Sequence, residues 1–308
     1  MVLIRVLGAA AGGGFPQWNC ACGGCRRARS GDSAARPRTQ ASLAVSADGG
    51  QWILLNASPD LPRQIMAAPQ LHPRTMGGRD SPIAAVVISS GDVDCIAGLL
   101  SLREKQGFSL YAGDPVMRIL DENSIFRVLD PELVRREALA DGRRTGIVDG
   151  GGNATGLLVE AFAVGGKIPL YHESADADDF ASDEAVIGLD VSDGAGRRLV
   201  FIPACAAVTP GLAARIEGAD ILFFDGTLWR DDEMIRSGTG GKTGRRMGHM
   251  SVSGPDGSIA ALAATRVGRR VFIHLNNTNP LLCDDSPEAA QARAAGWEIA
   301  RDGMEIGL

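Results

Sequence analysis

Short apolar stretches recur along the chain and alternate with segments of helical periodicity. The segments 41–46 and 51–56 are two such stretches around Asp48-Gly49-Gly50, which is the pattern of a β-hairpin. Ile83–Ile88 is apolar throughout, as expected for a strand buried on both faces. Further strands are predicted at 3–7, 108–112, 157–164, 185–191, 198–202, 221–224 and 271–275.

Helices are predicted between these strands. Strands and helices alternate without an internal repeat or a Pro/Ser-rich linker, so we expect a single α/β domain with mixed sheets over 1–308. Residues 226–248 hold many Gly, Arg and Lys, and we interpret them as a surface loop over a site. The helical segments are 61–68, the stretch that follows Ile88 and includes Ile96, 114–123, 130–138, 211–216, 257–264 and 286–295.

Composition narrows the class of protein. The chain has 308 residues, of which 45% are hydrophobic and 22% charged, as in a folded protein with a large core. Its net charge of −6 and the lack of a basic stripe disfavour nucleic acid as a partner. No apolar run approaches the roughly 18–20 residues of a membrane helix, so we expect no membrane partner. The sequence does not decide the oligomeric state, with a homodimer among the alternatives.

The N-terminal stretch is short, is interrupted by Arg5 and is interpreted as a first strand rather than a signal peptide. The glycine run 8–14 follows it. That run lacks the Lys and Ser/Thr of a P-loop and continues into Phe15-Pro16, a poor helix start, so nucleotide binding is disfavoured. Three of the six cysteines lie within six residues, a spacing that is unusual for the disulfide framework of a secreted protein. A reducing cytoplasm is therefore the expected location.

Cys20, Cys22 and Cys25 form a C-x-C-x-x-C run inside a small loop at 15–30. Three thiolates this close can surround one soft cation, and Zn²⁺ prefers four ligands in a tetrahedron. We expect a structural zinc site whose fourth ligand comes from elsewhere, with Asn277 as one conceivable donor. The competing interpretation is three reduced surface thiols.

A second group of candidate ligands is Ser90, Asp92, Asp94 and Cys95, which lie between a buried strand and a helix. The metallo-β-lactamase superfamily carries H-x-H-x-D-H at such a place, and here the frame keeps the Asp and loses the histidines. Only four His occur in the whole chain, so a metal site must rely on carboxylates or thiolates. Asp225 and His274 also end predicted strands, where that superfamily has ligands.

Each of these residues also has a structural interpretation. Asp92 and Asp94 are good helix caps, and Asp225 is followed by Gly226 as in a turn. Cys95 is equally compatible with a small buried hydrophobic residue and with a ligand. His274 at the end of an apolar strand is compatible with a purely structural role.

Over residues 3–308 the chain resembles the pyrroloquinoline quinone (PQQ) biosynthesis protein B family. The resemblance implies a metallo-β-lactamase fold, an αββα sandwich with two mixed sheets flanked by helices. It implies structural Zn²⁺ on the cysteine run and an Fe²⁺- and O₂-dependent hydroxylation of the tyrosine part of a Glu-Tyr diamino acid, a small amino-acid-derived substrate. The motifs that carry it are Gly12–Cys20, Asn56-Ala57-Ser58-Pro59-Asp60, Asp92-Val93-Asp94, Asp225-Gly226-Thr227, Met247-Gly248-His249 and Ile273–Pro280.

The resemblance also implies site residues. The metal ligands become Asp92, Asp94, Asp225 and His274, and Cys95 stands where the family normally has a His. Cys95 either ligates as a thiolate or leaves the site weak. Asp94, His274 and His249 are the expected catalytic residues, with His249 contacting substrate or transferring a proton; a surface His is the alternative. His172 lies roughly where the superfamily has another metal His, whereas Cys205 and Cys283 are expected to be unliganded.

Arg245 and Arg246, together with Lys242, are candidates for binding substrate carboxylates, although a solvated basic loop fits equally. Two other functions compete with the hydroxylase. A dinuclear metal-dependent hydrolase is disfavoured by Ser90 and by the shortage of His. A non-catalytic carrier of PQQ or its precursor is the third hypothesis, in which Cys95 marks a decayed site.

Overall fold

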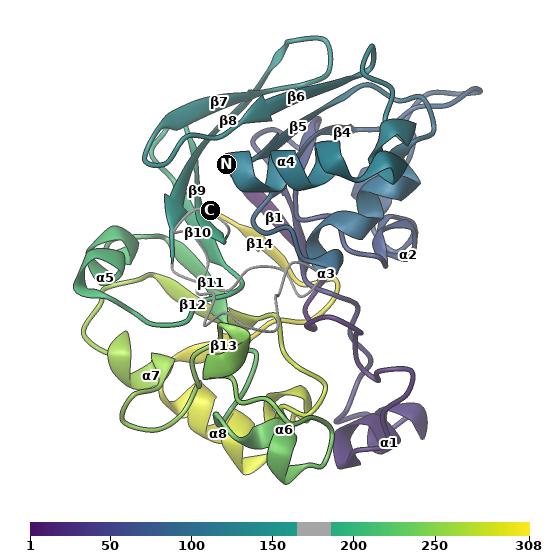
Figure 1. Ribbon diagram of the computed structural model, residues 1–308. Helices are drawn as coiled ribbons and strands as arrows, with labels where there is room; N and C mark the ends of the chain where they lie inside the picture. Colours follow the sequence, from purple (N-terminus) through teal and green to yellow (C-terminus); the bar gives the residue numbers. More distant parts are fainter. Residues whose placement is uncertain (165–185) are drawn as a thin grey trace.

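Two mixed β-sheets lie face to face in the centre of the molecule, and helices cover their outer faces (Figure 1). The computed structural model describes residues 1–164 and 186–308, and within these residues each sheet has seven strands. The first sheet has the order β14 (Glu305–Gly307), β1 (Leu3–Gly8), β2 (Ser42–Ser46), β3 (Trp52–Leu55), β4 (Ile83–Ile88), β5 (Phe108–Ala112), β6 (Val134–Ala138). The second has the order β13 (Trp297–Ile299), β12 (Arg269–Ile273), β11 (Ile221–Asp225), β10 (Arg198–Ile202), β9 (Ile187–Asp193), β8 (Ala154–Ala163), β7 (Arg144–Val148).

Each sheet combines a parallel and an antiparallel half. Strands β3 to β6 are parallel in the first sheet, and β10 to β13 are parallel in the second. The remaining neighbours pair antiparallel, including the β2–β3 hairpin that the sequence predicts. Loops that follow the parallel strands β11 and β12 leave from the same edge of the second sheet, which gathers their side chains in one place.

Alternating side chains divide the core into layers. On β11, Ile221 and Phe223 belong to the central core between the sheets, where they pack in one cluster with Ile4 of β1. Leu222 and Phe224 belong to the outer cluster that the helices cover. This alternation follows from the two-residue period of a strand, and it confirms the predicted αββα sandwich.

The helices are short and their apolar faces bury the outer side of each sheet. α2 (Leu61–Met66), α3 (Val93–Ile96) and α4 (Asp114–Glu122) cover the first sheet, whereas α5 (Pro210–Ile216) and α8 (Pro287–Ala294) cover the second, whose outer cluster also includes residues of α1 (Gly23–Arg29) (Figure 1). The α-helices are α1 (Gly23–Arg29), α2 (Leu61–Met66), α3 (Val93–Ile96), α4 (Asp114–Glu122), α5 (Pro210–Ile216), α6 (Glu233–Arg236), α7 (Ser258–Ala261) and α8 (Pro287–Ala294). Short 3₁₀ helices occupy Pro69–Leu71, Ala97–Leu102, Ser124–Val128, Arg245–Met247 and Pro280–Leu282.

The helix predicted over 130–138 is wrong. Val134–Ala138 is strand β6, which pairs in parallel with β5 at the edge of the first sheet. Arg and Glu favour a helix in isolation, but the hydrogen bonds to β5 and the burial of Val134 outweigh this weak preference. Strand β7, at the edge of the other sheet, was not predicted because Gly146 and the flanking polar residues weaken its apolar pattern.

The helix predicted after Ile88 is only one α-turn long. It continues as the 3₁₀ segment Ala97–Leu102, which packs closely on the loop after β3. The backbone N–H of Gly98 donates to the carbonyl of Ala57 at 2.8 Å, and a Cβ on Gly98 would lie 2.2 Å from the Ser58 carbonyl oxygen. Only glycine fits there, and this contact fixes the position of α3.

Among the residues that the structure describes, no helix combines the length and the apolar character needed to cross a membrane.

Candidate functional site

His274 lies immediately beyond β12, where the backbone leaves the sheet. The predicted strand extends to Leu275, but β12 ends at Ile273 and His274 adopts a left-handed conformation with φ of 59°. Its Nε2 lies 2.9 Å from Oδ2 of Asp94 in α3, and its Nδ1 lies 2.8 Å from Oγ1 of Thr227. The left-handed turn therefore directs the imidazole across the gap between the two sheets, because Asp94 follows the first sheet and His274 the second.

Asp94 and His274 each shift the pKa of the other. Burial lowers the pKa of His274, but the hydrogen bond and charge of Asp94 outweigh burial and raise that pKa above its usual value. Burial raises the pKa of Asp94, and the hydrogen bond and charge of His274 in turn hold it below its usual range. Each group therefore favours the charged form of the other.

Asp225 is the last residue of β11 and is completely buried. Its Oδ2 accepts from the backbone N–H of Cys205 at 2.9 Å and lies 2.7 Å from Nδ1 of His249. Its Oδ1 accepts from the backbone N–H and the hydroxyl of Thr227, at 2.9 and 2.6 Å. Burial raises its pKa, but the charge and hydrogen bond of His249 outweigh this effect and hold the pKa below its usual range. The site therefore contains a charged, fully hydrogen-bonded carboxylate.

His249 joins Asp225 and His274 in one compact group. The two imidazole rings stack with centroids 5.2 Å apart at an interplanar angle of 21°. Donor atoms of Asp225, His249 and His274 all lie within 4.8 Å of one another. Two imidazoles and one carboxylate are the ligand set of mononuclear non-haem iron sites. The sequence analysis placed His249 in a catalytic role but not among the ligands, because Met247-Gly248-His249 lies in a polar loop with no strand-end signal.

Thr227 connects all three members of this group. Its Oγ1 lies 3.1 Å from Nδ1 of His249 and 2.8 Å from Nδ1 of His274, and it donates to Asp225. Thr227 itself is nearly buried. A hydroxyl can both donate and accept, so one side chain orients both rings and the carboxylate. Sequence reasoning noted the Asp225-Gly226-Thr227 motif but did not assign Thr227 a role.

Residues 90–95 form the side of the site that faces His274. Asp92 precedes α3 without a side-chain cap, and its Oδ2 accepts from the Ser90 hydroxyl at 2.8 Å. Burial and the charge of Asp94 raise the pKa of Asp92. Cys95 is 6% exposed, and burial together with the charges of Asp94 and Asp92 raises its thiol pKa well above the usual value. Asp92, Asp94 and Cys95 lie outside the compact Asp225–His249–His274 group.

A cavity of about 460 Å³ opens over these residues. The expected loop 226–248 covers it through α6 and the 3₁₀ turn Arg245–Met247, as predicted. The lining residues are Gly12, Ser89, Ser90, Asp92, Asp94, Cys95, Val186, Pro203, Ala204, Met234, Gly240, Gly241, Lys242, Met247, Gly248, His249 and His274.

Of the three basic residues that the sequence offers for substrate carboxylates, Lys242 lines this cavity. Arg245 lines a neighbouring 750 Å³ cavity, which His249 also lines, and Arg246 lines neither of the two. The 3₁₀ turn explains this result, because it directs Met247 into the first cavity and Arg245 away from it. Of the remaining histidines, His72 contacts the Met66 carbonyl at 3.2 Å, and His172 lies outside the described residues.

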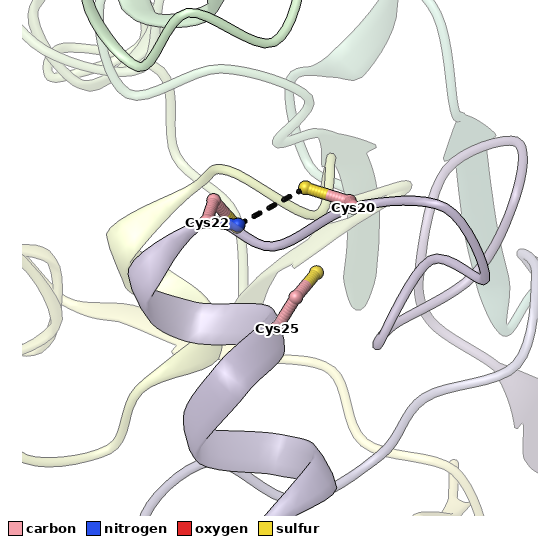
Figure 2. A group of neighbouring side chains, drawn as sticks. All are labelled: Cys20, Cys22 and Cys25. Carbon is pink, nitrogen blue, oxygen red and sulfur yellow. Dashed lines mark hydrogen bonds between the residues drawn. The ribbon is translucent and has the colours of Figure 1, made fainter.

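The three clustered cysteines form a second group at the start of α1 (Figure 2). All are free, and their sulfurs lie within 4.8 Å of one another. The backbone N–H of Cys22 donates to Sγ of Cys20 at 3.4 Å, the dashed line in Figure 2. Cys25 is completely buried, which contradicts the interpretation as three surface thiols.

Asn277 completes this group from the far end of the chain. Its Nδ2 lies 3.0 Å from Sγ of Cys20, 3.5 Å from Cys25 and 3.8 Å from Cys22. Oxygen and nitrogen of a side-chain amide are assigned from such contacts, so either atom of Asn277 can face the sulfurs. Three converging sulfurs and one amide fit a tetrahedral zinc ion.

The pKa values of the cluster differ between neighbouring thiols. Burial raises the pKa of Cys20, but hydrogen bonds from Cys22, Cys25 and Asn277 outweigh it and lower that pKa below its usual value. Burial raises the pKa of Cys22 to about 12. Cys20 is therefore the more acidic of these two thiols, and a bound cation would favour release of the Cys22 proton.

Comparisons with known proteins agree over nearly the whole chain. The Beta-lactamase superfamily domain matches residues 51–275. Coenzyme PQQ synthesis protein B of Gluconacetobacter diazotrophicus is 54% identical over 99% of both chains, and that of Xanthomonas euvesicatoria is 53% identical over the same shares. The crystal structure of Zn²⁺-bound PqqB from Methylobacterium extorquens superposes with a TM-score of 0.95 at 51% identity, covering 99% of this chain and 100% of that one. The chain therefore belongs to the coenzyme PQQ synthesis protein B family of the β-lactamase superfamily.

Proposed function

We propose that this protein acts in PQQ biosynthesis as a metal-dependent oxygenase that hydroxylates the tyrosine-derived ring of a Glu-Tyr diamino acid. The names of its relatives, at 54% and 53% identity over 99% of the chain, support the pathway. The observation that carries the reaction is the compact group of Asp225, His249 and His274 beside a 460 Å³ cavity. Two imidazoles and one carboxylate leave positions open on ferrous iron for O₂ and substrate.

In this proposal Asp225, His249 and His274 hold the iron, and iron supplies the redox chemistry that activates O₂. Zinc has no redox chemistry, so a zinc ion alone does not account for ring hydroxylation. Thr227 fixes the orientation of both rings, since its hydroxyl contacts Nδ1 of each at 3.1 and 2.8 Å. Asp94, 2.9 Å from Nε2 of His274, accepts the proton that this imidazole must release when a metal binds.

The cavity walls fit an aromatic amino acid. The methionines Met234 and Met247 offer apolar, adaptable surface for a ring, and Lys242 offers a cation for a carboxylate. Asp92, whose pKa is raised by burial and by the charge of Asp94, is placed to exchange a proton with the substrate. The cysteine cluster with Asn277 holds zinc in a structural role, because three sulfurs converge there. The Zn²⁺-bound relative supports zinc as a bound metal.

The test is a single turnover with protein that is loaded anaerobically with Fe²⁺ and supplied with a two-electron reductant, because one atom of O₂ enters the ring and the other must be reduced to water. We expect O₂ uptake on admission of air and a product heavier than the substrate by one oxygen atom. Zinc-loaded protein is the matched control and should consume no O₂. If iron-loaded protein binds the diamino acid but leaves both O₂ and substrate unchanged, the carrier hypothesis replaces this one. Phosphodiesterase turnover by zinc-loaded protein would instead favour the hydrolase.

A further inference from the structure

The two candidate metal sites share one short backbone segment. His274 belongs to the site beneath the cavity, and Asn277, three residues later, contacts the sulfurs of Cys20 and Cys25. The chain reaches the first site with β12 and leaves the second through the 3₁₀ helix Pro280–Leu282. Residues 274–279, here called the bridging segment, therefore form a wall of both sites.

Hydrogen bonds fix the bridging segment near His274. The N–H of Leu275 donates to the Ala9 carbonyl at 2.9 Å, and the Leu275 carbonyl accepts from Ala11 at 2.8 Å. The N–H of Asn276 donates to the Thr227 carbonyl at 3.0 Å. Thr227 also contacts both imidazoles, so a shift of the segment at Asn276 moves the residue that orients the candidate iron ligands.

At its other end the segment depends on the cysteine loop. The side chain of Asn277 is 5% exposed and makes its contacts with the three sulfurs, while the Asn277 carbonyl lies 3.6 Å from Sγ of Cys22. Sulfur is a weak hydrogen-bond partner, and hence a metal on the three sulfurs would hold Asn277 more firmly than these contacts alone.

Glu233 of α6 ties the middle of the segment to the cavity. Its Oε1 accepts from the Thr278 hydroxyl at 2.6 Å, and that hydroxyl accepts from Nδ2 of Asn276 at 2.6 Å. Glu233 is 9% exposed, and the next residue, Met234, lines the cavity. Movement of the bridging segment would therefore reach the substrate wall as well as His274.

We propose that the bridging segment couples the two sites, so that zinc on Cys20, Cys22 and Cys25 increases the metal affinity of the Asp225–His249–His274 group. Asn277 and Thr278 are then positioning residues for a centre that neither contacts as a ligand. The inference rests on the proposed function only in that this group binds a metal. Coupling of this kind is reciprocal, and loss of a partner that orients ligands typically weakens metal affinity by about 10–100-fold.

The test measures Co²⁺ binding to the histidine site of zinc-loaded protein from its visible absorption. Asn277→Leu removes the amide at nearly constant volume and should weaken Co²⁺ binding by about tenfold or more. Asn277→Asp keeps an oxygen for the cluster and should recover most of that loss. Cys283→Ser, a buried cysteine outside both sites, is the matched control and should bind Co²⁺ as the unmodified protein does.

A second variant distinguishes a loss of coupling from a loss of folding. Thr278→Val leaves all the sulfurs and Asn277 in place but removes the hydroxyl that joins Asn276 to Glu233, and it should also weaken Co²⁺ binding, with recovery in Thr278→Ser. Reciprocally, His274→Ala should weaken zinc binding at the cysteines, measured by competition with a chelator.

Equal Co²⁺ affinities in Asn277→Leu, Thr278→Val and Cys283→Ser would overturn the coupling. The readout is binding of the metal alone, so this result does not depend on whether hydroxylation occurs. The coupling can therefore be tested even if the hydroxylase proposal fails.

Discussion

Nδ1 of His249 lies 2.7 Å from Oδ2 of Asp225, although the two residues are separated by a loop of more than twenty residues. The contact completes a group of two imidazoles and one carboxylate at the end of β11 and β12. A chain with only four His thus brings two of them together beside a buried carboxylate. The scarcity of His does not prevent a site of the iron type.

His249→Ala should reduce metal affinity at this site and abolish hydroxylation, because it removes one of the two imidazoles. The measurement is iron content after anaerobic loading and desalting, together with O₂ uptake. His72→Ala, which changes a histidine distant from the cavity, should retain both. Full iron content in His249→Ala would show that His249 is not a ligand.

Cys95→Ala should retain iron, because the buried Cys95 lies outside the compact group. We expect metal content close to that of the unmodified protein, measured by elemental analysis. Loss of iron in this variant would make Cys95 a ligand. Cys95→His tests the decayed-site hypothesis in the same assay: turnover that appears only with the introduced imidazole would mean that the native chain has lost catalysis.

Gly98→Ala should destabilise the fold by about 1–3 kcal/mol, since the new Cβ would lie 2.2 Å from the Ser58 carbonyl oxygen and must displace α3. Because α3 carries Asp94, substrate turnover should fall as well. Gly194→Ala is the matched control, with no heavy atom within 4 Å of its Cβ. Chemical denaturation measures the free energy of unfolding, and equal values for the two variants would refute the close contact.

Stability should fall as the pH rises through the titration of Glu233. Burial raises the pKa of Glu233 from 4.5 to about 7. Between these values the folded state binds more protons than the unfolded chain, so the contribution is complete below about pH 4.5 and is lost on approaching pH 7. The loss is on the order of 2–3 kcal/mol.

Glu233→Gln cannot titrate at this position and should lack that part of the pH dependence. The comparison is the free energy of unfolding of both proteins between about pH 5 and pH 8. Parallel curves for the two proteins would mean that Glu233 keeps an ordinary pKa.

The strands whose pattern lies in neighbouring residues were predicted correctly from the sequence. The apolar run Ile83–Ile88, the hairpin 41–56 and the strand before Asp225 depend on neighbouring residues, and each is present in the structure. The segment 130–138 was predicted as a helix because its composition does not indicate that Val134–Ala138 pairs with β5. Edge strands depend on pairing more than on propensity.

The site residues that local sequence signals identify differ from those that depend on contacts between distant segments. Asp225 and His274 were identified because they end strands, whereas the ligand position of His249 depends on the path of a long loop. Arg245, Arg246 and Lys242 were proposed to bind substrate from charge alone, but the direction of a short 3₁₀ turn decides which side chain enters the cavity, and of these three Lys242 lines it. Asn277 was an open candidate for the cysteine site, and its contacts with the sulfurs strengthen that assignment.

The most direct test of the central claim is the origin of the oxygen atom in the product. Iron-loaded protein, the Glu-Tyr diamino acid and a two-electron reductant would be mixed in isotopically labelled O₂ with ordinary water, and then in ordinary O₂ with labelled water. An oxygenase at the Asp225–His249–His274 group predicts label in the hydroxylated ring only in the first experiment. Label that enters the product only from water, or a substrate that remains unchanged in both, would contradict the account.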